Sequence, residues 1–80
     1  EMEPLLGTFK AKAKYIDPIE HGGEEFAMVI RGEFRFEIGG NAHHLREGDC
    51  VYFQGAQSHS WENLSDEEGS LLMVTTPPGV

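Results

Sequence analysis

Alternation of apolar and polar side chains is the main pattern along the chain. From residue 8 to residue 16 aromatic or small residues alternate with three lysines, and from residue 33 to residue 38 Phe34, Phe36 and Ile38 alternate with charged residues. Neighbouring side chains of a β-strand point to opposite faces, so both runs predict strands with one buried face. The lysines would line the exposed face of the first strand, as in a protected edge strand.

The other apolar segments are short and are separated by turn residues. Residues 26–30, FAMVI, are apolar throughout, which predicts a strand covered on both faces. Gly39-Gly40-Asn41 predicts a hairpin turn. Further short strands are expected at residues 42–45, 50–53, 58–61 and 70–76. Because no window shows a helical period, the sequence predicts one all-β domain, a small antiparallel sandwich or barrel.

Composition and charge exclude several classes of function. The 80 residues carry a formal net charge of −8, from 14 acidic against 6 basic residues, which argues against contact with nucleic acid by this segment. No apolar segment is long enough for a membrane helix, so no membrane contact is expected. A chain this short buries a small core, which favours oligomerisation. The single cysteine, Cys50, excludes an internal disulfide and fits a reducing, cytoplasmic location.

Three residues form a candidate metal site. Side chains four positions apart on a strand share a face, so His21 and Glu25 can point the same way unless Gly22 and Gly23 break the strand. His59 lies on a separate expected strand, and two imidazoles with one carboxylate can bind Fe(II) and similar ions. A histidine beside two glycines is more often an ordinary loop residue, so the spacing leaves both interpretations open.

The sequence resembles the cupin family, first in the motif around His21. That motif reads H-x-H, three or four residues, E, six residues and G. His21 falls on its second histidine, and Glu25 and Gly32 follow at the required spacings. Ile19 stands where the first histidine belongs, so the resemblance implies a reduced ligand set. Some cupin oxygenases use such a set, and many cupins without metal keep part of it.

The second cupin motif is found around His59. Gly48 opens it, His59 takes its histidine and Asn63 its asparagine, while residues 54–56, QGA, replace P-x-G. The resemblance covers residues 18–78 and implies a small antiparallel jelly-roll barrel. It also implies that His21, Glu25 and His59 would hold one divalent transition metal, such as Fe, Mn, Zn or Ni; the sequence leaves open whether any is bound.

The chain further resembles the C-terminal cupin of bacterial helix-turn-helix regulators of the Xre type. The resemblance is carried by HGGEEF at 21–26, by GDCVYF at 48–53 and by the terminal VTTPP. It implies that residues 1–80 are a single cupin domain and a fragment of a longer regulator. The DNA-binding helices would then lie upstream, and the cupin would sense a small-molecule effector within a homodimer.

Three functions remain open at this stage. In the sensing hypothesis Phe34, Phe36 and Trp61 line the ligand site, although both phenylalanines also suit a core. The second hypothesis is a free-standing metal-dependent enzyme, a dioxygenase or an isomerase. The third is a metal-free binding or structural cupin. The sequence does not decide whether any reaction is catalysed.

An apolar stripe predicts how the homodimer forms. If Glu25 faces the interior as a ligand, alternation turns Ala27 and Val29 inward as well. The outward side chains of this strand are then all large and apolar: Phe26, Met28 and Ile30. A soluble monomer rarely exposes such a stripe, so we expect a second copy of the same sheet to cover it.

Overall fold

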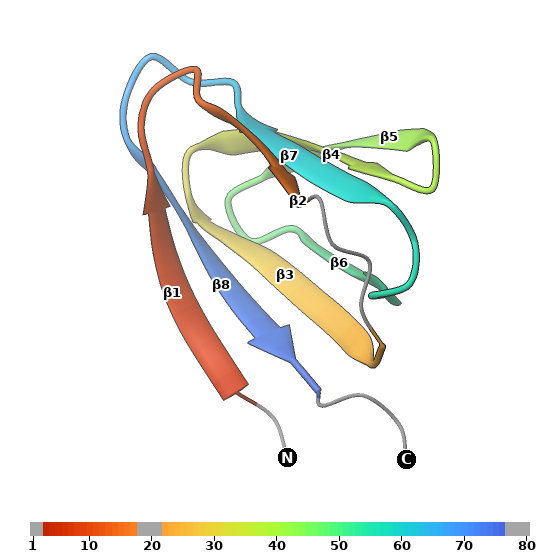
Figure 1. The fold of residues 1–80 in the computed structure, drawn as a ribbon. Coiled ribbons are helices and arrows are strands. Elements are labelled where there is room, and N and C mark those ends of the chain that lie inside the picture. The colour runs from red at the N-terminus through yellow and green to blue at the C-terminus, as the bar shows by residue number, and fades with distance from the viewer. Residues whose placement is uncertain (1–2, 18–21, 77–80) are drawn as a thin grey trace.

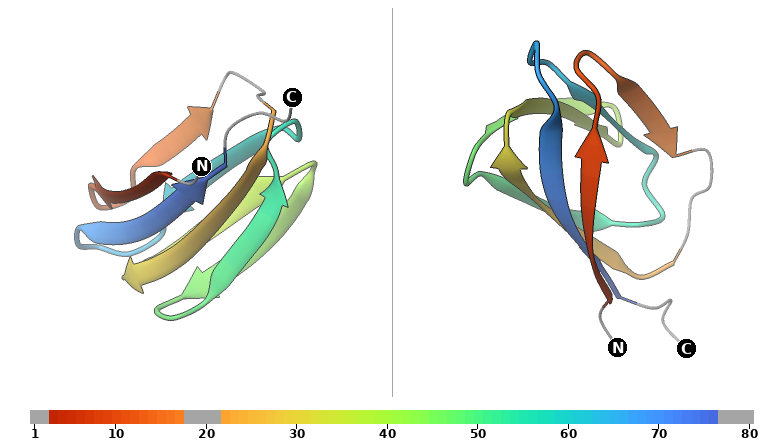
Figure 2. Two further views of the ribbon diagram at one scale, coloured as in Figure 1. Left: turned by 90° about the horizontal axis from the view of Figure 1, so that it is seen from below. Right: turned by 90° about the vertical axis from the view of Figure 1, so that its left-hand side faces the viewer.

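The computed structural model describes residues 3–17 and 22–76, which form eight β-strands and no helix. One antiparallel sheet has the order β1 (Glu3–Phe9), β8 (Gly69–Thr75), β3 (Glu24–Arg31) and β6 (Cys50–Gln54). The other has the order β2 (Lys14–Asp17), β7 (His59–Asn63), β4 (Glu33–Ile38) and β5 (Asn41–Arg46). The two sheets lie face to face (Figures 1 and 2). The predicted all-β jelly-roll class is confirmed, and no helix that could span a membrane occurs in the described ranges.

The core lies between the two sheets and follows the predicted alternation. Burial alternates strictly along β3 from Glu24 to Val29 and along β4 from Glu33 to Ile38. Each sheet contributes one apolar inner face. The buried apolar residues are Ala27, Val29, Phe34, Phe36, Ile38, Leu45, Phe53 and Leu71.

The single strand predicted over residues 8–16 is wrong, because the chain turns in the middle of this run. The amide of Ala13 donates to the carbonyl of Lys10 over 3.1 Å. Lys12 lies in the left-handed region, with φ of 60°. The two strands on either side of this turn, β1 and β2, belong to different sheets. The turn therefore carries the chain across the sandwich (Figure 1).

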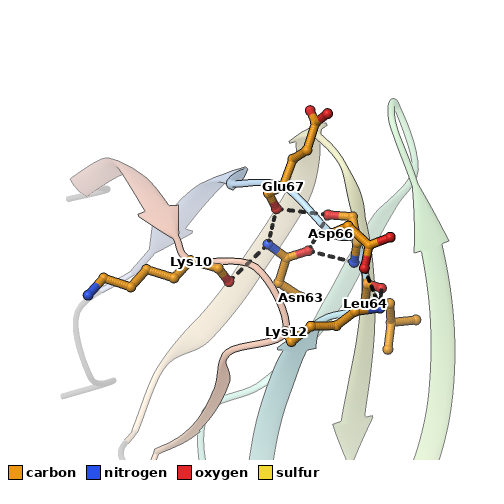
Figure 3. Close-up of polar contacts among 7 residues, drawn as sticks. Lys10, Lys12, Asn63, Leu64, Asp66 and Glu67 are labelled. Carbon is orange, nitrogen blue, oxygen red and sulfur yellow. Dashed lines mark hydrogen bonds and ion pairs between the residues drawn. The ribbon is translucent and has the colours of Figure 1, made fainter.

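Contacts from a distant loop hold this turn. The Nζ atom of Lys12 donates to the carbonyl of Leu64 over 2.6 Å and lies 3.3 Å from a carboxylate oxygen of Asp66 (Figure 3). Alanine and lysine have a weak preference for strands, so local preference does not oppose the turn. The regular alternation was therefore misleading here.

The hairpin predicted at Gly39-Gly40-Asn41 is confirmed. Ile38 pairs with Asn41, which leaves Gly39 and Gly40 as a two-residue loop. Their φ angles are +56° and +87°. A turn with positive φ at both central residues matches the twist of the flanking strands and strongly favours glycine.

Gly69 marks a close approach between the two sheets. A Cβ atom at this position would lie 2.8 Å from Cζ of Phe34 and 3.1 Å from the carbonyl oxygen of Arg31. Because Phe34 is fully buried, its ring cannot move aside without opening the core. We expect Gly69→Ala to lower the free energy of unfolding by about 1–3 kcal/mol, measured by urea unfolding followed by circular dichroism.

Two further variants distinguish a clash with the Phe34 ring from an effect of backbone conformation. Gly40→Ala meets nothing within 4 Å, so its loss of about 1 kcal/mol should come from the backbone conformation alone. If the ring of Phe34 is the obstacle, Gly69→Ala combined with Phe34→Leu should be less destabilised than the sum of the single variants. Simple additivity in this double-mutant cycle would contradict the steric explanation.

The outer faces of the two sheets differ in polarity. On the β2-β7-β4-β5 sheet, Arg35 lies 3.2 Å from the carboxylate of Glu37 and 3.6 Å from that of Glu62. The β1-β8-β3-β6 sheet has an apolar outer face, as the pairings across its strands show. We call this surface the apolar outer face; its residues are Leu6, Phe26, Met28, Ile30, Tyr52, Leu72 and Val74.

The predicted orientation of the FAMVI strand is confirmed. Both of its faces were predicted to be covered, but only the inner face is fully buried. Ala27 and Val29 are fully buried on the inner face. Phe26 and Met28 are half-buried on the outer face, and Ile30 is 46% exposed. Within one chain, the outer side of β3 is therefore only partly covered.

Candidate functional site

A carboxylate and an imidazole meet between the two sheets. Glu25 projects inward from β3 and is 5% exposed, and His59 projects inward from the start of β7 and is 4% exposed. Nε2 of His59 lies 3.2 Å from Oε1 of Glu25. Ionisable groups are rarely buried so deeply without compensating partners, so this buried pair is the candidate functional site.

Neighbouring groups fix the orientation of the His59 ring. Nδ1 lies 2.7 Å from the main-chain carbonyl oxygen of Gln57. A carbonyl oxygen only accepts hydrogen bonds, so Nδ1 carries a proton and donates it. The ring also packs against Phe53, with centroids 5.1 Å apart, and stacks on Trp61 at 6.5 Å and 9°. The imidazole therefore presents Nε2 to the carboxylate in a defined direction.

This arrangement suits a cation. With Nδ1 protonated, a neutral His59 ring directs the lone pair of Nε2 at an oxygen of Glu25, and two acceptors repel each other unless positive charge lies at the contact. A proton or a metal ion supplies that charge. Ligands roughly 2.1 Å from a metal in neighbouring octahedral positions are about 3.0 Å apart, close to the observed separation. Imidazole nitrogen with carboxylate oxygen is also a common donor set for transition metals.

Two of the three predicted metal ligands therefore come together. The third, His21, lies outside the described residues. Within residues 3–17 and 22–76 no group of three or more His, Cys, Asp or Glu side chains could hold a metal ion. The predicted set of His21, Glu25 and His59 stays a prediction, with Glu25 and His59 as the part whose geometry fits.

The three predicted ligand-binding residues line the same interior. Phe34 and Phe36 have no exposed surface and belong to the core cluster. Trp61 is half-buried and lies on the inner face of β7, the face it shares with His59 as alternation predicted. Contact between these three side chains and a ligand stays a prediction.

Asn63 has a structural role that the sequence did not reveal. Its side chain is fully buried. Nδ2 donates to the carbonyls of Phe9, Lys10 and Glu67 at 3.2, 3.1 and 2.9 Å. Oδ1 accepts from the amide and the hydroxyl of Ser65 at 2.9 and 2.6 Å (Figure 3). One amide thus ties the turn before β2 to the loop after β7; the only signal in the sequence was its match to the motif.

A groove lies on the apolar outer face. Its volume is about 310 Å³, and its apolar floor includes Phe26 and Val74. At its rim the hydroxyl of Tyr52 donates to the carboxylate of Glu24 over 2.5 Å, and this hydrogen bond raises the pKa of Tyr52. Strand β3 therefore presents a carboxylate to the interior and an apolar groove to the outside.

Comparisons with known proteins agree with this fold. The family model described as Cupin domain (Cupin_2) matches residues 5–75. The cupin domain of an XRE family transcriptional regulator from Enterobacter cloacae is 24% identical, with a TM-score of 0.87 over 98% of this chain and 83% of that chain. An HTH_3 family transcriptional regulator from Vibrio cholerae is 19% identical, with a TM-score of 0.86 over 98% of this chain and 44% of that chain.

A cupin enzyme is also similar in structure. A sugar phosphate isomerase from Silicibacter pomeroyi is 24% identical, with a TM-score of 0.74 over 94% of this chain and 50% of that chain. The chain thus spans half or less of the isomerase and of the Vibrio regulator. No curated protein sequence matches the chain significantly. At these identities the structural similarities concern the fold.

Proposed function

Because the chain belongs to the Cupin_2 family of cupin domains, we propose that it is the small-molecule-sensing domain of a bacterial transcription regulator, located in the cytoplasm. The observation that carries this proposal is the similarity over nearly the whole chain to the cupin domain of an XRE family regulator. DNA would be bound by a separate helix-turn-helix domain, because this segment has a net charge of −8.

In this proposal Glu25 and His59, together with His21, would hold a divalent metal beside the effector. The metal would supply a positive charge to which an oxygen atom of the effector binds. The residues of the chain prepare the site. The carbonyl of Gln57 sets the direction of His59, and Phe53 and Trp61 pack against its ring. Such supporting contacts tune affinity for a metal.

The metal hypothesis predicts that His59→Ala loses stoichiometric binding of Mn(II), because it removes the ligand that faces Glu25. Isothermal titration calorimetry of wild type and variant measures this, and elemental analysis of freshly purified protein checks it. His43→Ala is the matched control, because His43 is an exposed histidine on β5 and should leave binding unchanged. Binding should weaken in acid, because protons compete with the metal for both ligands.

Absence of binding by the wild type would reject this part of the proposal. Unchanged binding in His59→Ala would show that the bound ion does not lie between Glu25 and His59. Either result favours the alternative of a metal-free binding cupin, in which Glu25 and His59 form a buried ion pair.

The same proposal includes a homodimer formed through the apolar outer face. The contrast between this face and the ion-paired outer face of the other sheet supports the choice. Stable interfaces bury roughly 800 Å² per partner, and the apolar outer face extends over all four strands of its sheet. On β3, Glu25 faces the interior while its neighbours Phe26 and Met28 face the outside. A small shift of β3 on ligand binding would therefore reach the interface directly.

An enzyme is the second candidate, favoured by the buried carboxylate–imidazole pair. Such groups transfer protons in many enzymes. A free-standing dioxygenase would consume oxygen when loaded with metal, and an isomerase would interconvert sugar phosphates. Turnover that disappears in Glu25→Gln would establish the enzyme. Ligand-dependent stabilisation without turnover would favour the sensor.

A further inference from the structure

Trp61 carries a polar atom that no group of the chain satisfies. Its Nε1 is fully buried and has no hydrogen-bond acceptor. No other buried side-chain nitrogen or oxygen is in this position among residues 3–17 and 22–76. An unpaired buried donor destabilises the fold and is rare, so it calls for a specific explanation.

The surrounding rings hold the indole in place. Trp61 lies between Tyr15 on β2 and Phe36 on β4, its cross-strand neighbours. It stacks on Tyr15 at 6.2 Å and 15°, and on Phe36 at 5.8 Å and 23°. Phe9 meets it edge to face at 6.0 Å. Rotating the ring to bring Nε1 to water would break these contacts, so the N–H stays in an aromatic environment.

The ring of Trp61 lies beside the candidate cation site. Trp61 and His59 are two residues apart on the inner face of β7, and their rings are nearly parallel with centroids 6.5 Å apart. The cation site and the indole N–H attract ligand groups of opposite character. The carboxylate of Glu25 with Nε2 of His59 attracts positive charge, whereas an N–H group only donates and so attracts an acceptor.

We propose that Nε1–H of Trp61 selects the ligand of this barrel by donating to a carbonyl-type oxygen, as found in carboxylates and amides. The proposal rests on the sensing function above and adds the chemical class of the effector. A site with a buried donor in apolar surroundings discriminates strongly against molecules that lack the acceptor, because binding them leaves the donor unpaired. Protonated amines, which only donate, are excluded for the same reason.

The single tryptophan makes a direct test possible, because the indole region of a nitrogen-15 spectrum contains one signal. The probes are acetate, acetamide and ethylammonium at millimolar concentration, similar in size and different in head group. We expect acetate or acetamide to shift the indole signal in a saturable way, and ethylammonium to leave it unchanged. Comparison of the first two shows whether the oxygen must be charged.

Two variants test whether the N–H itself is responsible. Trp61→Phe keeps an aromatic ring and removes the donor, and should weaken binding of the responsive probe about 10-fold or more. Replacement of Trp61 by benzothienylalanine keeps the shape and exchanges N–H for sulfur. Without a probe, this second variant should be at least as stable as wild type, because no hydrogen bond is lost.

Failure of this inference and failure of the sensing function can be told apart. The methyl signals of Ala27 and Val29, which are buried on the facing sheet, report occupancy of the interior independently. A probe that shifts these methyl signals but not the indole, and binds Trp61→Phe equally well, overturns the role of Trp61 and leaves sensing intact. If no probe changes either set of signals, the inference about Trp61 fails, because it predicts that acetate or acetamide binds.

Discussion

We expect Asn63→Asp to lower the free energy of unfolding by about 3–5 kcal/mol, although it only exchanges the side-chain NH2 group for oxygen. The amide nitrogen that it replaces donates to the carbonyls of Phe9, Lys10 and Glu67. A carboxylate cannot donate, so three carbonyl oxygens would face a buried negative charge. For a domain of this size the midpoint of thermal unfolding should fall by roughly 12 °C or more.

Thermal and urea unfolding followed by circular dichroism measure this loss. Asn41→Asp is the matched control, because it is the same substitution at an exposed position and should change stability by less than about 0.5 kcal/mol. Asn63→Ala should also be strongly destabilising, because it leaves the same carbonyls and the amide of Ser65 unpaired. If Asn63→Asp were as stable as wild type, the loop and the turn would not depend on this amide.

Met28→Glu is expected to convert the proposed dimer to monomer. Met28 lies on the apolar outer face between Leu72 on β8 and Cys50 on β6, near the middle of the sheet. In a two-fold interface each copy would place a carboxylate against apolar side chains of the other. Burying such a charge without a partner costs several kcal/mol, so the dissociation constant should rise about 1000-fold or more.

Sedimentation equilibrium at micromolar concentration is the direct measurement. Ile16→Glu adds the same charge to an exposed apolar position on the outer face of the other sheet, and should leave the dimer intact. Circular dichroism must show that both variants are folded. A clean monomer mass for the wild type would reject the interface and leave the apolar outer face without its proposed cover.

Much of the fold follows from two local signals. Alternating burial predicted the inner faces of β3 and β4, and paired glycines predicted the hairpin at Gly39-Gly40. The same reasoning failed over residues 8–16, where alternating alanine and lysine looked like one strand. The turn at this place depends on contacts of Lys12 with Leu64 and Asp66, which lie more than fifty residues away. Local periodicity contains no information about such contacts.

For the candidate site, the sequence predicted which residues take part but not their geometry. The spacing of His21 and Glu25 left a loop interpretation open, and the match to cupin motifs brought His59 into the set. The structure adds what motifs do not contain: the direction of the imidazole and the distance from Nε2 to the carboxylate. Alternation placed Trp61 on the same face as His59, but its unpaired N–H depends on how rings from three other strands pack around it.

The pairing of β1 with β8 has a consequence for synthesis of the protein. β8 lies between β1 and β3, yet it is the last of these strands to be made. While the ribosome is still translating β8, β1 has no hydrogen-bonding partner in its sheet, and its unpaired main-chain groups are a target for chaperones or aggregation. This sheet can close only after residue 75 has left the exit tunnel. A chain truncated before β8 would therefore retain separated, unpaired edges instead of a smaller version of the fold.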